Sequence, residues 1–288
     1  MNVLETGAMS KTVRAALVSF ALLGSAAFVT GCQSDPDIDI TKLGVETDPP
    51  ELLYKQGLAN MNAGKMGEAA RKFEAVDKQH PFTEWGQKAL VMQTFIATRQ
   101  SRNEEAITTG NRFLRQYPNS SEAAYVQYMI GLAYSKQIQS VTQDQRAAAR
   151  TIEAMQKVID NYPKSEYVAD AQAKIRFARD QLAGREMQIG RYYLERKEFL
   201  AAVSRFRVVV EQYQNTNQIE EALARLTEAY YALGLSDEAQ TAAAVLGKNY
   251  PDSQWYADSH KLLQSGGLQP RENRGSWISR AGAKLIGA

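Results

Sequence analysis

The chain has 288 residues, and its 34 Lys and Arg residues against 32 Asp and Glu residues leave a formal net charge of +2 at pH 7. This near-neutral balance argues against a nucleic-acid partner, which calls for a concentrated basic face. A single cysteine excludes a disulfide within the chain. With only two histidines and no zinc-type spacing, the sequence predicts neither a metal site nor a cofactor.

The N-terminus has the layout of a secretory signal. Lys11 and Arg14 precede an apolar run over residues 15–29, which is short for a spanning helix of about 20 apolar residues. The run ends in VTGC, which resembles the bacterial lipobox, where cleavage leaves an acylated N-terminal cysteine. We therefore predict a lipoprotein signal peptide over residues 1–31 and lipid attachment at Cys32. The alternative is an ordinary signal peptide with an incidental free cysteine.

The residues after the signal predict attachment to a membrane through a tether. Two or more acyl chains anchor a protein stably, whereas one binds only marginally. Gln33 stands where enterobacterial sorting uses aspartate for inner-membrane retention, so the analogy predicts the periplasmic face of the outer membrane. Residues 32–50 are acidic, contain three prolines and lack an apolar period, which is typical of an extended tether.

A degenerate repeat occupies the body of the chain. Helical, apolar-periodic segments close at four dipeptides, His80-Pro81, Tyr117-Pro118, Tyr162-Pro163 and Tyr250-Pro251. The 34-residue tetratricopeptide (TPR) pattern laid on these prolines gives one register for five repeats, with an insertion inside repeat three and no terminal proline in repeat four. Residues 167–182 are also apolar-periodic and predict one long helix that leads into repeat four.

The repeat pattern has a steric reason. Small residues such as Gly57 and Ala69 let the two helices of a hairpin approach closely, and large residues such as Phe73 fill the seam. Proline ends the second helix because it cannot continue the hydrogen-bond ladder. No alternating strand pattern appears in the body. The predicted fold class is all-α, a TPR solenoid of five helix hairpins, and such arrays present long binding surfaces.

The register also predicts a groove in repeats one to three. Positions 2, 5, 9 and 12 of each first helix line the concave side of such solenoids, and here they are strongly apolar and aromatic. An exposed apolar surface of this kind marks a peptide or protein site. The alternative is that tight curvature buries these side chains between repeats. The candidate groove residues are Tyr54, Leu58, Met61, Val91, Phe95, Tyr125, Tyr128 and Leu132.

A lipobox followed by five such repeats resembles the BamD (ComL) family, TPR lipoproteins of the outer-membrane β-barrel assembly complex. The more specific segments are PPELLY, YPNS, YPKSEYVADAQAKI and REMQIGRYYLERKEF, and the likeness runs from Cys32 to about Gln264. It implies a non-enzymatic protein that binds the barrel protein BamA and other assembly lipoproteins. It also implies a part in recognising and inserting unfolded outer-membrane proteins, whose aromatic and alternating apolar segments the groove could bind.

Partner docking is expected in the C-terminal half of the chain. Arg205 and Arg207 lie among apolar neighbours in AAVSRFRVVVEQY, and the planar fork of arginine suits ion pairs at interfaces. In BamD-like proteins an arginine at the place of Arg205 lies where the last periplasmic POTRA domain of BamA docks. The resemblance therefore implies Arg205 as the docking residue, with Arg191 and Arg207 beside it. The alternative is a solvated charge on an amphipathic helix.

These expectations divide the body of the chain into three segments. Residues 51–165 hold repeats one to three as the substrate-binding half, and residues 166–264 hold the linking helix with repeats four and five as the partner-docking half. Residues 265–288 form a basic tail in which Trp277 and Ile278 could share one helical face. Three glycines near its end favour disorder, so we expect a flexible tail.

Two competing classes of function remain at this point. An enzyme lacks its parts, because His80 and His260 are isolated and no nucleophile elbow, P-loop or zinc motif occurs, so we predict no catalytic residue. The nearer alternative is a TPR lipoprotein adaptor that scaffolds peptidoglycan hydrolases or division proteins. Repeats alone support both, because a fold does not settle a function.

Overall fold

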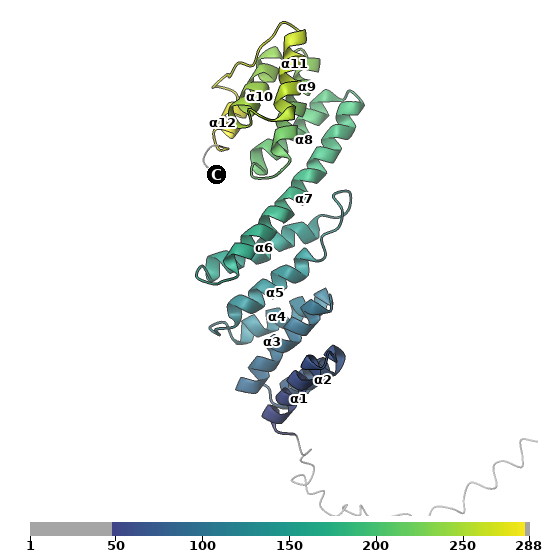
Figure 1. Ribbon diagram of the computed structural model, residues 1–288, viewed down its shortest axis with the longest axis vertical. Coiled ribbons are helices and arrows are strands. Elements are labelled where there is room, and N and C mark those ends of the chain that lie inside the picture. Colours follow the sequence, from purple (N-terminus) through teal and green to yellow (C-terminus); the bar gives the residue numbers. More distant parts are fainter. Residues whose placement is uncertain (1–47, 286–288) are drawn as a thin grey trace, which may run out of the picture. The chain divides into compact units, whose positions relative to one another are not determined.

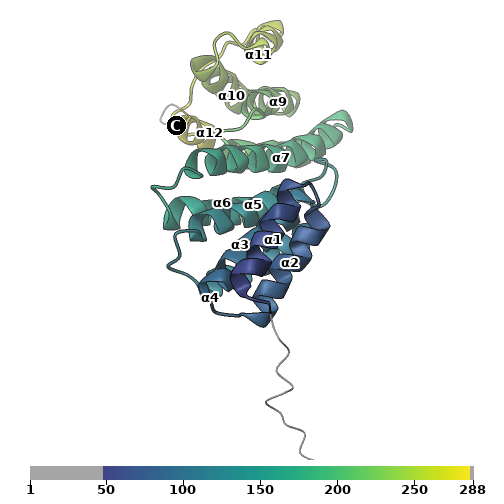
Figure 2. The same ribbon diagram turned by 60° about the horizontal axis from the view of Figure 1, so that its bottom comes forward.

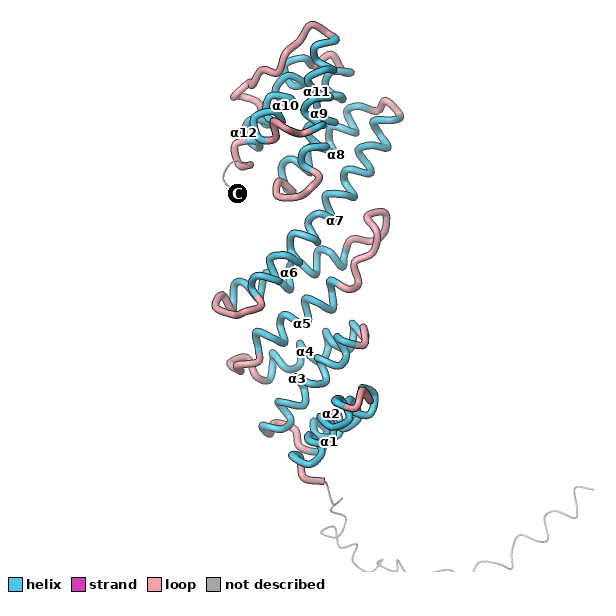
Figure 3. The backbone as a smooth tube through the Cα atoms, in the orientation of Figure 1, coloured by secondary structure: helices cyan, strands magenta, loops and turns pink. Residues whose placement is uncertain are grey.

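The computed structural model describes residues 48–285. The predicted signal peptide, the lipid site at Cys32 and most of the tether lie outside these residues. Within them the chain is helical and forms no strand (Figure 3). The helices are α1 (Pro50–Asn62), α2 (Met66–Gln79), α3 (Glu84–Arg99), α4 (Asn103–Gln116), α5 (Ala123–Ser135), α6 (Arg146–Asn161), α7 (Val168–Glu195), α8 (Phe199–Gln212), α9 (Ile219–Ala232), α10 (Ser236–Asn249), α11 (Gln254–Ser265) and α12 (Trp277–Gly282).

The helices from α1 to α10 pair in chain order as five antiparallel hairpins (Figure 1). Each hairpin packs on the next, through contacts of α2 with α3, α4 with α5, α6 with α7 and α8 with α9 (Figure 2). The helix α11 continues the array by packing on α9 and α10. The predicted all-α TPR solenoid of five hairpins is confirmed.

The second helices end where the sequence predicts. The helices α2, α4, α6 and α10 each stop one residue before an aromatic residue or histidine that precedes proline. Tyr162, for example, has φ −132° and ψ 55°, because a following proline disfavours the helical conformation. Tyr213 ends α8 in a similar conformation, with φ −124° and ψ 42°, although no proline follows it. Its backbone N–H donates to the Val209 carbonyl, so repeat four keeps the register without the proline.

Glycine at the seam of a hairpin allows the close approach that the pattern predicts. A Cβ atom on Gly57 would lie 2.7 Å from Cε1 of Phe73. Gly190 of α7 meets the Phe206 ring of α8 in the same way, and both phenylalanines are fully buried. The backbone of each first helix therefore rests directly on a ring from the second helix.

Repeat three differs from its neighbours in two ways that the sequence predicts. The loop between α5 and α6 carries the insertion, and its Val141 contacts α7 beside Gly184. The helix α7 runs unbroken for 28 residues from Val168 to Glu195, so the long helix that leads into repeat four is confirmed. It serves as the partner of α6 at one end and of α8 at the other.

The C-terminal segment differs from the flexible tail that the sequence led us to expect over residues 265–288. Residues 276–285 pack back on the last repeats, because α12 contacts α10 and α8. Ile278 is fully buried and Trp277 is half-buried against the same core. Burial of these two large side chains favours order, and it offsets the conformational freedom of the neighbouring glycines.

Candidate functional site

A surface cavity of about 490 Å³ lies where the first helices of three successive repeats meet. Three predicted groove residues line it, Tyr54 from α1, Val91 from α3 and Tyr125 from α5. The structure therefore brings one predicted groove residue from each of repeats one, two and three to a shared site. The other lining residues are Glu84, Gln87, Lys88, Met92, Ser121 and Glu122.

Aromatic rings and one ion pair shape this cavity. The Tyr54 ring packs 5.2 Å from the rings of both Phe73 and Trp85, and burial raises the pKa of its phenol. Lys88 lies 4.8 Å above the Trp85 ring and donates a 2.6 Å hydrogen bond to Glu84. That bond lowers the pKa of Glu84 and raises the pKa of Lys88. The cavity thus offers aromatic surface and polar groups at its rim, which suits polypeptide side chains.

Three further groove candidates pack between helices without lining the cavity. Leu58 and Met61 of α1 are half-buried against the cluster around Phe73. Phe95 of α3 is half-buried between the clusters of the first and second hairpins. The guanidinium of Arg99 lies 5.7 Å from the centre of the Phe95 ring. For these three side chains the structure supports the packing alternative at least as strongly as the groove.

Tyr128 and Leu132 belong to the contact between α5 and the helices that follow it. The Tyr128 ring stacks on Tyr167 at 4.9 Å, and its hydroxyl donates a 2.7 Å hydrogen bond to Asp170 of α7. Burial, and next this hydrogen bond to a carboxylate, raise the pKa of Tyr128. Leu132 is half-buried in the same cluster. Tyr128 is therefore held by α7 and stands apart from the cavity.

Arg205 of α8, the leading docking candidate, is engaged within the chain. Its guanidinium donates to Glu186 of α7 over 3.1 Å, and its side chain is 43% exposed against 19% for Glu186. The ion pair bridges the two helices of hairpin four beside the buried Phe206. Because part of the guanidinium faces solvent, its other nitrogens remain accessible to a partner carboxylate.

Arg191 of α7 takes part in a network with α9. It donates a 2.9 Å hydrogen bond to Glu221, and the same carboxyl group pairs with Arg225. Arg225 also pairs with Glu228 at 2.8 Å and lies 5.2 Å over the Trp255 ring. Arg191 therefore contributes to the contact between hairpins four and five.

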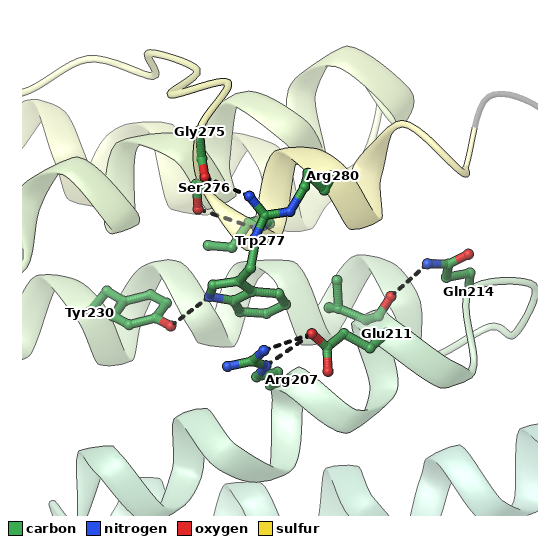
Figure 4. A network of polar contacts seen from close by, with 10 residues as sticks. Arg207, Glu211, Gln214, Tyr230, Gly275, Ser276, Trp277 and Arg280 are labelled. Atoms are coloured by element: carbon green, nitrogen blue, oxygen red, sulfur yellow. Dashed lines mark hydrogen bonds and ion pairs between the residues drawn. The ribbon is translucent and has the colours of Figure 1, made fainter.

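Arg207 lies on the side of α8 that α12 covers (Figure 4). Its Nε and Nη2 atoms both donate to Glu211, at 3.0 and 2.9 Å. The Trp277 ring of α12 lies 4.7 Å from its guanidinium. The three arginines therefore do not converge, because their ion-pair partners lie on α7 for Arg205, on α9 for Arg191 and on α8 for Arg207.

Sequence reasoning overlooked several residues of the candidate site. Lys88 occupies a groove position in the repeat register, but its charge hid its place beside Tyr54 in the cavity. Trp85 precedes the register position, and only the packing of α1 on α3 reveals its contact with Tyr54. A second cavity, of about 440 Å³, lies between the insertion loop and α7, lined by Val141, Thr142, Arg185, Gln188, Ile189, Tyr192 and Tyr193.

Two further searches bear on what the described part of the chain can do. Within residues 48–285, no three His, Cys, Asp or Glu side chains gather closely enough to hold a metal ion. Every helix in this range is too short or too polar to cross a membrane.

Comparisons with known proteins connect this arrangement to a family. A family model described as an outer membrane lipoprotein, YfiO, matches residues 46–246. The chain is 40% identical over 253 residues to the outer membrane protein assembly factor BamD of Caulobacter vibrioides, which covers 88% of this chain and 82% of that protein. It is 35% identical over 257 residues to BamD of Rickettsia prowazekii, which covers 89% of this chain and 98% of that protein.

Among solved structures, the chain is similar to a thermophilic TPR protein of Thermus thermophilus. The two are 16% identical with a TM-score of 0.34, over 73% of this chain and 98% of the other. A likeness at this level decides nothing about function, and the five hairpins establish the fold without it.

Proposed function

This chain belongs to the YfiO family of outer membrane lipoproteins, with the BamD outer membrane protein assembly factors, and from this membership we propose how it acts in assembly. It is a non-enzymatic binding component of the β-barrel assembly machinery. It binds a BamA-like barrel protein with POTRA domains and other assembly lipoproteins, and it helps to recognise and insert unfolded outer-membrane proteins.

The proposed location is the periplasmic face of the outer membrane, where lipid on Cys32 holds the chain. The family description as an outer membrane lipoprotein and the VTGC motif behind an apolar run support this location. Several acyl chains on one cysteine would make the attachment stable, and the acidic residues that follow would separate the folded body from the membrane.

The observation that carries substrate recognition is the cavity shared by α1, α3 and α5. Tyr54, Val91 and Tyr125 supply apolar surface from three repeats, and unfolded barrel proteins present aromatic and alternating apolar side chains. Tyrosine rings give large contact area and hydrogen-bonding tips, so they can accept many such segments without a strict sequence requirement. We assign the first contact with substrate to this cavity, with Leu58, Met61, Phe95, Tyr128 and Leu132 supporting its walls.

We assign docking of the BamA-like partner to the surface around Arg205. Its side chain is anchored by Glu186 yet 43% exposed, so it is both oriented and accessible. An oriented arginine loses less conformational freedom when it meets a partner carboxylate. Arg191 and Arg207 are the weaker members of this set, because neighbours within the chain already engage their guanidinium groups.

Copurification tests this function directly. Outer membranes that carry the chain with a C-terminal tag are extracted in mild detergent, and the copurifying proteins are identified by mass spectrometry. We expect a large β-barrel protein with POTRA domains, and we expect Arg205→Glu to reduce its recovery by about tenfold or more, because breaking a desolvated charge pair costs at least about 2 kcal/mol. Arg176→Glu, at an exposed arginine of α7, is the matched control and should retain the barrel protein.

A charge-swapped variant separates docking from an effect on the fold. Glu186→Arg with Arg205→Glu restores an ion pair between α7 and α8 with reversed polarity. If Arg205 contacts the partner, the swapped variant still fails to capture it. Recovery of the barrel protein by the swapped variant would show that Arg205 matters only through Glu186. Capture of murein hydrolases without any such barrel protein would contradict the assembly role itself.

A further inference from the structure

The segment that follows α11 forms a strap and a short helix on the outside of the last two hairpins. Arg271 pairs with Asp237 at 2.8 Å, and Gln240 donates a 2.7 Å hydrogen bond to the Gln269 carbonyl. These contacts hold the strap along α10. The family match ends at residue 246, so this segment lies beyond what the family description covers.

Several specific contacts seat α12 on α8 and α10 (Figure 4). The Ser276 hydroxyl accepts from the Ile278 N–H, and it donates to Glu238 at 2.6 Å. The Trp277 indole N–H donates to the Tyr230 hydroxyl at 3.3 Å. The side chain of Gln214, from the end of the α8 hairpin, donates to the Ala281 carbonyl. The segment is therefore built into the fold.

Docking of α12 creates a cavity that α8 alone does not have. This cavity has a volume of about 360 Å³, and its lining holds three cationic side chains and one carboxylate, a formal net charge of +2. Both contacting nitrogens of Arg207 approach a single oxygen of Glu211, so this pair compensates itself. Its remaining lining residues are Gln214, Trp277, Arg280, Ala281 and Lys284.

The two cations on the C-terminal segment lack an acidic partner within residues 48–285. Arg280 donates to the Gly275 carbonyl at 2.8 Å, which directs its guanidinium but leaves its charge uncompensated. Lys284 forms no ion pair with any described acidic side chain and is exposed. Arg207 stays in place under the Trp277 ring. The excess charge is therefore concentrated at one cavity whose walls are held by packing.

We propose that the cavity between α8 and α12 binds a phosphate group, carried by a lipid headgroup or free in solution. A phosphate has three oxygens for cationic donors from Arg207, Arg280 and Lys284, whereas one arginine fork satisfies a carboxylate. A phosphate monoester carries close to two negative charges at neutral pH, which matches the excess of the cavity. Basic pockets are known to take lipid headgroups in this way.

This inference is independent of the proposed function, since it uses neither Arg205 nor the cavity at α1, α3 and α5. Two probes separate the sources of phosphate. Isothermal titration of the full mature chain with inorganic pyrophosphate reports a free phosphate. Sedimentation with phosphatidylglycerol vesicles, against phosphatidylcholine vesicles, reports an anionic lipid surface. Because the predicted Cys32 lipid would itself bind vesicles, both measurements use chain carrying Cys32→Ser without its signal peptide.

Matched variants test whether the cavity, and not charge alone, does the binding. Arg280→Gln with Lys284→Gln should weaken binding of the effective probe by about thirtyfold, since each cation near an anionic surface contributes about fivefold. Arg274→Gln removes an exposed cation from the same segment outside the cavity and should change binding by less than about threefold. Circular dichroism checks that the helices of each variant are retained.

The outcomes are distinct. Saturable binding of pyrophosphate with this variant pattern supports a phosphate site, and binding of phosphatidylglycerol vesicles alone with the same pattern assigns it to a lipid headgroup. Binding of neither probe overturns the proposal. Equal losses from Arg274→Gln and from the double variant would also overturn it, as would equally tight binding of hexaglutamate, which would indicate an acidic peptide instead. A failed capture of the barrel protein leaves all these readings unchanged.

Discussion

Tyr128 links two helices through a single side chain. Its hydroxyl donates a 2.7 Å hydrogen bond to Asp170, and its ring stacks on Tyr167 at 4.9 Å, while Tyr125 lies 5.3 Å from the same ring. Three tyrosines and one carboxylate therefore join α5 to the start of α7. Of these, only Tyr125 reaches the aromatic cavity, so the cluster supports the cavity wall from behind.

Removing the Tyr128 hydroxyl should weaken this link without changing the ring contact. Tyr128→Phe should lower the free energy of unfolding by about 1 kcal/mol, because the hydrogen bond to Asp170 is lost and that carboxylate keeps part of its desolvation cost. Urea unfolding followed by circular dichroism measures the change. The control is Tyr134→Phe, whose hydroxyl has no hydrogen-bond partner within residues 48–285, and equal losses in both variants would contradict a specific role for Asp170.

The same cluster makes stability depend on alkaline pH. Burial is the largest cause that raises the pKa of Tyr128 above 10.0 and the pKa of Tyr167 to about 12. The folded state therefore favours the neutral phenols, whose contribution is complete below about pH 10 and declines as the pH rises toward about 12. Unfolding free energies measured across that window should fall, and Tyr128→Phe should flatten the decline. A phenolate absorbance that titrates with no lag behind free tyrosine would contradict the raised pKa values.

At the scale of the element, the hairpin depends on how closely two helices approach. Gly190 sits against the Phe206 ring with no space for a Cβ atom, and the neighbouring Ala183 and Ala202 are fully buried in the same core. The approach lets the ring fill the seam, so the hairpin angle is determined by small residues on one helix and a large residue on the other.

Alanine at Gly190 should therefore destabilise the chain although alanine is the better helix former. We expect the free energy of unfolding to fall by about 1–3 kcal/mol, the usual cost of overpacking a core. Gly67→Ala in α2 is the matched control, since no atom lies within 4 Å of its added Cβ, and it should be neutral or stabilising by up to about 1 kcal/mol. Thermal unfolding of both variants checks the prediction, which fails if Gly190→Ala is as stable as Gly67→Ala.

The element α12 shows how a short helix gains order from its surroundings. Six residues are too few to be helical on their own, yet Ile278 is fully buried and Ser276 caps the first turn. Gly282 lies against Val245 of α10 in space too small for a larger residue. The glycine that favoured a flexible tail in the sequence is thus the residue that permits the close contact.

At the scale of the whole molecule, the two proposed binding surfaces lie on different hairpins. The cavity belongs to α1, α3 and α5, whereas Arg205 belongs to α8 and pairs with α7. In a repeat array each unit contacts mainly its neighbours, so a change in one surface should leave the other intact. The division of labour proposed for residues 51–165 and 166–264 depends on this independence.

A charge placed in the cavity should separate the two activities. Met92→Glu puts a carboxylate in the cavity wall and should weaken crosslinking to unfolded barrel-protein peptides by about tenfold or more, because an apolar side chain no longer finds a dry contact. Copurification of the barrel partner should stay unchanged. Met66→Glu, at a half-buried position of α2 outside the cavity, controls for destabilisation, and a joint loss of both activities in Met92→Glu alone would contradict the two-surface division.

The architecture followed from local patterns in the chain. Helix-breaking prolines marked the ends of α2, α4, α6 and α10, and small residues at fixed positions identified the seam of each hairpin. These signals act between residues close in sequence, or within one repeat, so a linear pattern contains them. For the same reason the long helix α7 and the insertion before α6 could both be predicted.

The sites depended on contacts that no linear pattern contains. The register could rank Tyr54, Tyr125 and Tyr128 as equals, but only the packing of α7 on α5 turned Tyr128 toward Asp170 and left the other two at the cavity. Arg191, Arg205 and Arg207 likewise looked alike until Glu221, Glu186 and Trp277 engaged them from other parts of the fold. By itself the sequence determined the helices and their pairing, because local sterics set both. Only the tertiary structure decided which side chains remain available to a partner, because burial and ion pairing depend on neighbours that lie far away along the chain.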